Sequence, residues 1–122
     1  MRKTLLFVAA LSLALFSAPV RANDEGGEAK EVTVTGEVLD LTCFLEHGAK
    51  GADHATCAKS CLVGGLPAGF LEDKTGNVYL VITKDHKSAN AALADKAGKT
   101  VKITGVIKKS QGVNVLVMAK VE

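Results

Sequence analysis

Apolar and polar residues alternate with a period of two in several short stretches of this chain, which is the pattern of strands with one buried face. Val32, Val34 and Val38 share one face of the first stretch, and threonine and glutamate occupy the other. This stretch predicts a strand over 32–44, with Gly36 marking a bulge or a bend. The same alternation predicts four more strands, at 68–72, 78–84, 99–109 and 113–121.

Two segments between these strands have a helical composition instead. The segment "ADHATCAKSCL" has a candidate N-cap at Asp53 and runs into a Gly-Gly pair, which predicts a short helix over 54–63. The Ala-rich segment 88–98 ends at Gly98 and predicts a second helix. The order of elements predicts a mainly β domain. It is a small five-stranded OB-fold-like barrel, with one helix between strands three and four and a short helical Cys/His insertion between strands one and two.

Two stretches of the sequence carry a resemblance that agrees with this order. The segments "VTVTGEVLDLTC" and "GKTVKITGVIKKSQGVNVLVMAKVE" resemble the first strand and the last two strands of small exported bacterial OB-fold proteins. The likeness covers most of residues 32–121. It implies the fold, but OB-folds bind nucleic acids, oligosaccharides or cofactors, so it does not choose among functions. The Cys/His insertion is the distinctive part of this chain.

The first 22 residues have the features of a secretory signal peptide. Two basic residues precede the apolar run "TLLFVAALSLALF", and small residues at Val20 and Ala22 suit cleavage after Ala22. The mature protein is therefore expected in the periplasm or outside the cell, with no membrane span after cleavage. Residues 23–31 are polar and Gly-rich and predict a flexible N-terminus, and residues 32–122 form the OB-fold-like domain.

The charge of the mature chain argues against nucleic acid as a partner. Three of the 15 basic residues lie in the signal peptide, so 12 remain against 13 acidic residues and the formal charge is close to −1. Nucleic-acid binding proteins need a basic surface, and stacking on single strands needs aromatic side chains. Only Phe44, Phe70 and Tyr79 remain after cleavage.

All three cysteines and two of the three histidines lie within the segment "CFLEHGAKGADHATCAKSC". On a helix, residues spaced by three, four and seven share one face, so His54, Cys57 and Cys61 are expected to form a stripe. Thiolate and imidazole are preferred ligands of Zn(II), and thiolate favours Cu(I). The sequence predicts a metal site with Cys43, His54, Cys57 and Cys61 as first ligands, and His47 and His86 in reserve.

A disulfide competes with this metal site, because exported cysteines usually pair. Cys43 bonded to Cys57 or Cys61 would staple the insertion to the barrel, which then serves as a binding module for a protein, a saccharide or a small ligand without metal. The odd cysteine count leaves one thiol over in that case. A redox role of Cys57 and Cys61 is a third interpretation, although the usual exchange motif has two intervening residues. Haem attachment through Cys-x-x-Cys-His is excluded by the sequence.

Catalysis is not predicted, because no nucleophile, base and acid come together in the sequence. Asp40, three residues before Cys43, either orients a ligand histidine or caps the end of the strand. In OB-folds the connection between strands one and two borders the ligand-binding face. The expected function is therefore an exported protein that binds Cu(I) or Zn(II) for storage, delivery or structural locking, with a periplasmic protein as a possible partner.

Overall fold

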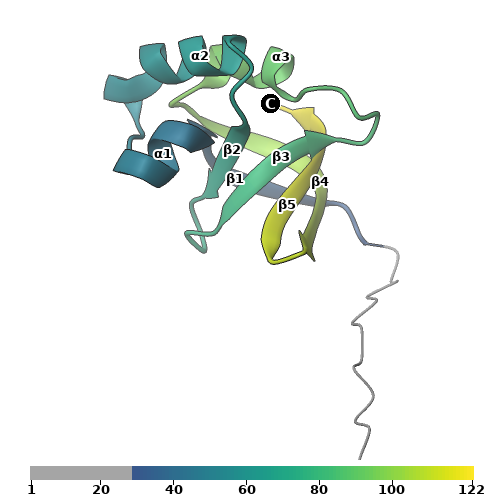
Figure 1. The fold of residues 1–122 in the computed structure, drawn as a ribbon. Helices are drawn as coiled ribbons and strands as arrows, with labels where there is room; N and C mark the ends of the chain where they lie inside the picture. Colours follow the sequence, from purple (N-terminus) through teal and green to yellow (C-terminus); the bar gives the residue numbers. More distant parts are fainter. Residues whose placement is uncertain (1–28) are drawn as a thin grey trace, which may run out of the picture.

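A computed structural model describes residues 29–122, which form a closed barrel of five strands with short helices gathered at one end (Figure 1). The predicted signal peptide, 1–22, and residues 23–28 of the predicted flexible segment lie outside the described residues. Within those described, no helix is long and apolar enough to cross a membrane. The strands are β1 Val32–Asp40, β2 Ala68–Glu72, β3 Val78–Thr83, β4 Thr100–Ser110 and β5 Val113–Val121.

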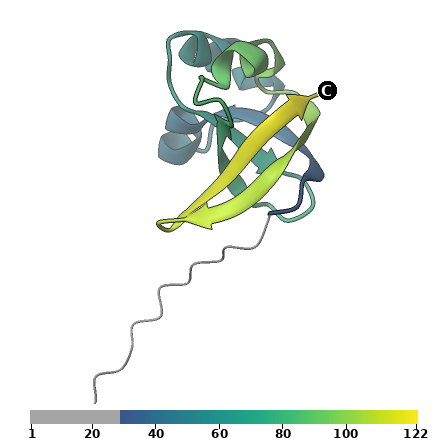
Figure 2. The ribbon, with the colours of Figure 1, turned by 90° about the vertical axis from the view of Figure 1, so that its right-hand side faces the viewer.

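The barrel closes in the order β1-β2-β3-β5-β4, with β4 returning to pair with β1. All neighbouring strands are antiparallel except β3 and β5, which run parallel. The long β4–β5 hairpin crosses the front of the barrel in Figure 2. The mainly β class and the five-stranded barrel predicted from alternation are confirmed.

One hydrophobic core fills the barrel and continues into the helices. Val38, Phe70, Ile103 and Leu116, one from each of four strands, are fully buried. Leu62 and Leu93 come from two different helices and belong to the same cluster. The helices therefore cover the barrel end with apolar side chains, and their rotation about their own axes is set by this packing.

The helices of the insertion between β1 and β2 are α1 Leu41–His47, the 3-10 turn η1 Ala52–His54 and α2 Ala55–Val63. A further short helix, α3 Asn90–Leu93, continues into the 3-10 turn η2 Ala94–Lys96 between β3 and β4. This pair is shorter than the helix predicted over 88–98. Helices α2 and α3 are in contact across the barrel end, and α1 lies beside them (Figure 1).

The structure differs from the sequence prediction at the end of the first strand, which stops at Asp40 rather than running to 44. The carboxylate of Asp40 accepts hydrogen bonds from the backbone N–H groups of Thr42 (3.0 Å) and Cys43 (3.2 Å). These bonds cap α1, because the first N–H groups of a helix have no partner inside it. The predicted cap at Asp53 is wrong, since Gly51 holds the N-cap position of η1 and no side chain caps it.

Gly36 lets β1 and β2 approach closely, although pairing continues through it without the predicted bulge. It faces Glu72 on one side and Val101 on the other. A Cβ at this position would lie 2.1 Å from the carbonyl oxygen of Leu71. Gly105 has the same role against β5, and there the register does shift, between Thr104 and Gly105.

The side chain of Asn90 clamps the C-terminal end of α2. Its amide nitrogen donates to the carbonyl oxygens of Leu62 (2.7 Å) and Leu66 (2.8 Å). Asn90→Ala is expected to lower the free energy of unfolding by about 1–3 kcal/mol, because Leu66 loses the side-chain donor to its carbonyl and Leu62 keeps only the N–H of Gly65. Urea denaturation measures the effect. The matched control is Asn114→Ala, which removes only one 3.4 Å bond, and equal losses in the two variants would contradict the clamp.

Candidate metal centre

Two elements of the insertion present the cysteines to each other. Cys43 lies in α1, whose orientation depends on its Asp40 cap. Cys57 and Cys61 lie four residues apart in α2. The neighbouring face of α2, about 100° around the helix axis, is anchored by Ala58 and Leu62, which are buried in the core. Because the buried face fixes the rotation of α2, the two cysteines are directed away from the core and toward α1.

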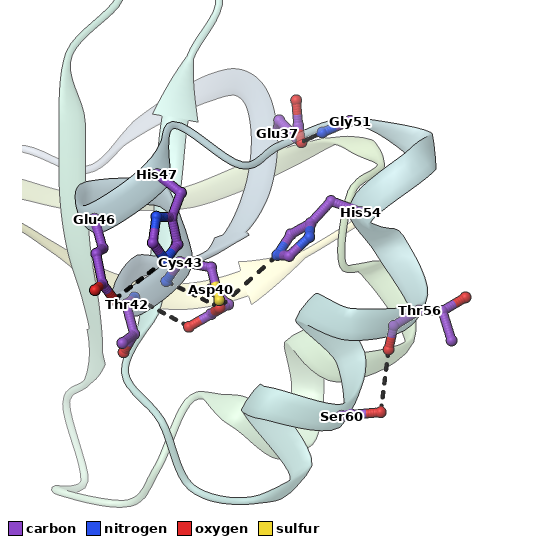
Figure 3. A network of polar contacts seen from close by, with 10 residues as sticks. All are labelled: Glu37, Asp40, Thr42, Cys43, Glu46, His47, Gly51, His54, Thr56 and Ser60. Carbon is purple, nitrogen blue, oxygen red and sulfur yellow. Dashed lines mark hydrogen bonds and ion pairs between the residues drawn. The ribbon is translucent and has the colours of Figure 1, made fainter.

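The segment that carries His54 is tied to β1. The carboxylate of Glu37 accepts a hydrogen bond from the backbone N–H of Gly51, just before η1. His54 ends η1, and its ring points back toward Asp40 and Cys43 (Figure 3). The histidine thus enters the space between α1 and α2 from η1, a third element of the insertion.

Two groups of donor atoms result, and Cys43 belongs to both. In one, the donor atoms of Cys43, His54 and Cys57 lie within 4.8 Å of one another. In the other, those of Asp40, Cys43 and Cys61 lie within the same distance. Two sulfur ligands of a tetrahedral zinc ion are about 3.8 Å apart, so small side-chain rotations bring these atoms to ligand positions. Each of the four residues predicted as first ligands therefore belongs to at least one of two groups that share Cys43.

The Nε2 atom of His54 is the buried side-chain nitrogen or oxygen left without a hydrogen-bond partner in residues 29–122. Its nearest charged neighbour is Asp40 Oδ2, at 4.0 Å, which is beyond hydrogen-bonding distance (Figure 3). A buried polar atom without a partner costs free energy. The atom lies among thiols, and a metal ion held there would satisfy it.

No disulfide joins the cysteines, all three of which lie in the described part of the chain. Cys43 and Cys61 are half-buried, whereas Cys57 is exposed. The cluster is therefore accessible from the side on which Cys57 lies, and it has the free thiols that a soft metal ion requires.

Asp40 raises the pKa of two of the thiols, Cys43 and Cys61. Its hydrogen bond with Cys43 is the largest of several causes that raise the pKa of Cys43 to about 12, followed by burial and by the charge of Asp40. Burial, and then the charge of Asp40, raise the pKa of Cys61 as well. Burial would raise the pKa of Asp40 itself, but hydrogen bonds from Cys43 and Thr42 outweigh it and hold this pKa below its usual value.

In the reduced, metal-free chain, we expect iodoacetamide to modify Cys57 before Cys43. Cys57 is exposed, and Asp40 keeps Cys43 protonated, whereas the thiolate is the reactive form. Asp40→Asn keeps a side chain able to cap α1 but removes the charge. The pKa of Cys43 then falls, and its alkylation profile moves to lower pH. Peptide mass mapping over time measures both rates, and an unchanged Cys43 profile in the variant would contradict this role of Asp40.

The two reserve histidines do not join either donor group. His47 is exposed at the end of α1 and lies 3.4 Å from its neighbour Glu46. His86 is exposed in the turn after β3, with a positive φ of 61°. Both histidine side chains are exposed to solvent, and spacing in the sequence could not reveal this.

Asp40 is the residue of the site that sequence reasoning left undecided between orienting a histidine and capping the strand. It is 1% exposed, caps α1 and stands within reach of both Cys43 and Cys61. The sequence does contain a usable indication, because an aspartate at the end of a strand followed by "LTCFLEHG" has the form of an N-cap, a short helix and a C-terminal glycine. Gly48 ends α1 with φ of 70°, as this pattern predicts.

Comparison with known proteins adds no relative. No family model, no curated protein and no solved structure matches this chain. The functional argument therefore depends on the geometry of the Cys/His cluster.

Proposed function

We propose that this protein is an exported, non-catalytic metal-binding protein, in which Cys43, His54, Cys57 and Cys61 bind one Cu(I) or Zn(II) ion. The order β1-β2-β3-β5-β4 and the parallel β3–β5 pair support an OB-fold-like barrel. The cluster is built in the connection between the first two strands, next to the face that OB-folds use for ligands. The features of the first 22 residues support the periplasm or the exterior as its location.

The observation that carries the proposal is the unpartnered Nε2 atom of His54 beside the free thiols of Cys43 and Cys57. A neutral imidazole nitrogen and thiolates are the donors that zinc and copper sites use. A purely structural histidine would have a hydrogen-bond partner at this buried atom. Binding of an ion would replace the missing partner and bring together three elements of the insertion.

The donor set allows two coordination modes. Three thiolates and one imidazole form the Cys3His set of tetrahedral zinc sites. The smaller group of Cys43, His54 and Cys57 is rich in soft donors, which Cu(I) favours. In either mode Asp40 stays close to the ligands, where it holds α1 in place and its charge bears on the two half-buried thiols.

Exposure of Cys57 favours storage or delivery over structural locking. Structural zinc sites are closed, with all their ligands protected by the fold. Here one ligand is exposed while the others are at least partly covered. An incoming donor from a partner protein can replace Cys57 first, because it is the ligand that such a partner reaches. The partner would offer thiolate, thioether or imidazole groups of its own.

The test is anaerobic titration of the reduced mature chain with Cu(I) and, separately, with Zn(II). Competition with a chromophoric chelator gives the affinity, and elemental analysis after gel filtration gives the metal content. We expect one ion per chain and protection of the cysteines from alkylation. Failure of both ions to bind would overturn the proposal. A single disulfide and one alkylatable thiol in protein isolated without reductant, combined with that failure, would favour the disulfide-stapled binding module.

Unfolding experiments separate delivery from locking. If the ion serves delivery, the metal-free chain remains folded, because its core and barrel pairing do not depend on the cluster. If the ion locks the structure, its removal abolishes cooperative unfolding, as in small domains that fold only with metal. Circular dichroism of the chelator-treated protein distinguishes these cases.

A further inference from the structure

We infer that Cys43 and Cys57 form a reversible disulfide that releases the bound ion, so that the site is controlled by oxidation. The inference rests on the proposed function for its metal part. The bond itself follows from the placement of the thiols and can be tested without any metal.

The first argument is the position of Cys43 in both donor groups. A disulfide at Cys43 takes its sulfur from the group with His54 and Cys57, and also from the group with Asp40 and Cys61. One bond therefore disables the two groups together. Oxidation between Cys57 and Cys61 would leave Cys43, His54 and Asp40 in place, and so would remove less of the site.

The second argument is that Cys43 and Cys57 can meet. Their sulfur atoms lie within 4.8 Å, and a disulfide is about 2.0 Å long. They belong to different helices, α1 and α2, joined by a segment that contains Gly48 and Gly51. Both glycines have positive φ, 70° and 81°, and a Cβ added at either would meet no atom within 4 Å. A rotation at these glycines can close the remaining gap.

The third argument separates Cys57 from Cys61 as the partner of Cys43. Both lie within 4.8 Å of Cys43, so distance does not choose between them, but Cys61 is half-buried. Cys57 is exposed and meets a dissolved oxidant first. Cys61 is then the third, unpaired thiol of this odd set.

The oxidant is a small-molecule disulfide, and the chemistry is two thiol–disulfide exchanges. The Cys57 thiolate attacks one sulfur of the oxidant, a mixed disulfide forms and one small thiolate leaves. The Cys43 thiol, which is hydrogen-bonded to Asp40, then loses its proton and attacks the Cys57 sulfur, and the second small thiolate leaves. Two electrons pass to the oxidant, which becomes two thiols by taking the two protons that the cysteines give up. The metal ion keeps its oxidation state. It is released because two of its thiolate ligands, Cys43 and Cys57, are now joined in a disulfide.

The experiment treats the full mature chain with oxidised glutathione, first without metal and then loaded with Zn(II). In the metal-free chain we expect a Cys43–Cys57 disulfide by peptide mass mapping, formed after a transient glutathione adduct on Cys57. Cys61→Ser should keep this bond, and Cys43→Ser should stop at the adduct. In the loaded chain, a chromophoric chelator should report nearly complete release of zinc, reversed by a dithiol reductant.

The outcomes distinguish the two proposals. A Cys43–Cys61 disulfide overturns the inference. So does a glutathione adduct on Cys57 that persists in the chain without substitutions. Zinc that stays bound after the disulfide has formed overturns its metal part. A chain that never binds zinc or copper but forms the Cys43–Cys57 bond overturns the proposed function and leaves the bond standing. His47→Ala is the control, because this exposed histidine lies outside both donor groups.

Discussion

Cys43→Ser is expected to abolish tight binding of Cu(I) or Zn(II), with an increase in Kd of more than about 100-fold. Changes to residues that only orient metal ligands already cost about 10–100-fold in affinity, and removal of a ligand costs more. Cys43 is the ligand shared by both donor groups, so no complete group survives its loss. Cys57→Ser and Cys61→Ser each leave one group intact, and we expect smaller effects from them.

Competition titration of the reduced chains with a chromophoric chelator gives the affinities. His47→Ala and His86→Ala are the matched controls, because both histidines are exposed and stand outside the donor groups. His54→Ala should weaken binding, since its Nε2 atom points at the cluster. A Cys43→Ser chain that binds as tightly as the original would place the metal elsewhere.

Gly36→Ala is expected to destabilise the fold by about 3 kcal/mol, the upper part of the range for overpacked sites. The added Cβ would lie 2.1 Å from the carbonyl oxygen of Leu71 and 2.9 Å from the Cα of Glu72. These are backbone atoms, so a change of rotamer cannot relieve the contact, and β1 must separate from β2. For a domain of this size the midpoint of thermal unfolding should fall by on the order of 10–20 °C.

Thermal unfolding followed by circular dichroism measures this loss. Gly64→Ala is the matched control, since Gly64 has φ of −71° and the added Cβ would approach no closer than 3.3 Å, to the carbonyl oxygen of Ser60. We expect a change within about 1 kcal/mol there. If the two variants unfold at the same temperature, the close approach of β1 and β2 is not what requires glycine at position 36.

Strand positions could be predicted well where alternation continues to the end of the element. The strands at 68–72 and 113–121 have the predicted bounds; turn residues follow the first and precede the second. The first strand was predicted too long, because the apolar residues after Asp40 continue a strand-like pattern. The hydrogen bonds from Thr42 and Cys43 to Asp40 show that a helix begins there instead. The hydrogen bonds of the Asp40 N-cap therefore outweigh the strand-like alternation that continues after Asp40.

The sequence showed that many potential metal ligands lie in one short segment. It did not show which of them come together in the folded protein. The predicted stripe of His54, Cys57 and Cys61 on one helix is replaced by two groups centred on Cys43. His54 lies in η1, just before α2, and so it approaches from a separate direction. His47 has the same spacing from Cys43 that Cys61 has from Cys57, yet its side chain points to solvent.

By itself the sequence determined the order of the strands, the barrel class and the gathering of all thiols in one insertion. These properties follow from local periodicity and from the order of residues along the chain. Only the tertiary structure decided which donors meet, because burial of Ala58 and Leu62 fixes the rotation of α2 and the cap at Asp40 fixes that of α1. The rotation of α2 is set by packing between distant segments, and no spacing within a single element contains it.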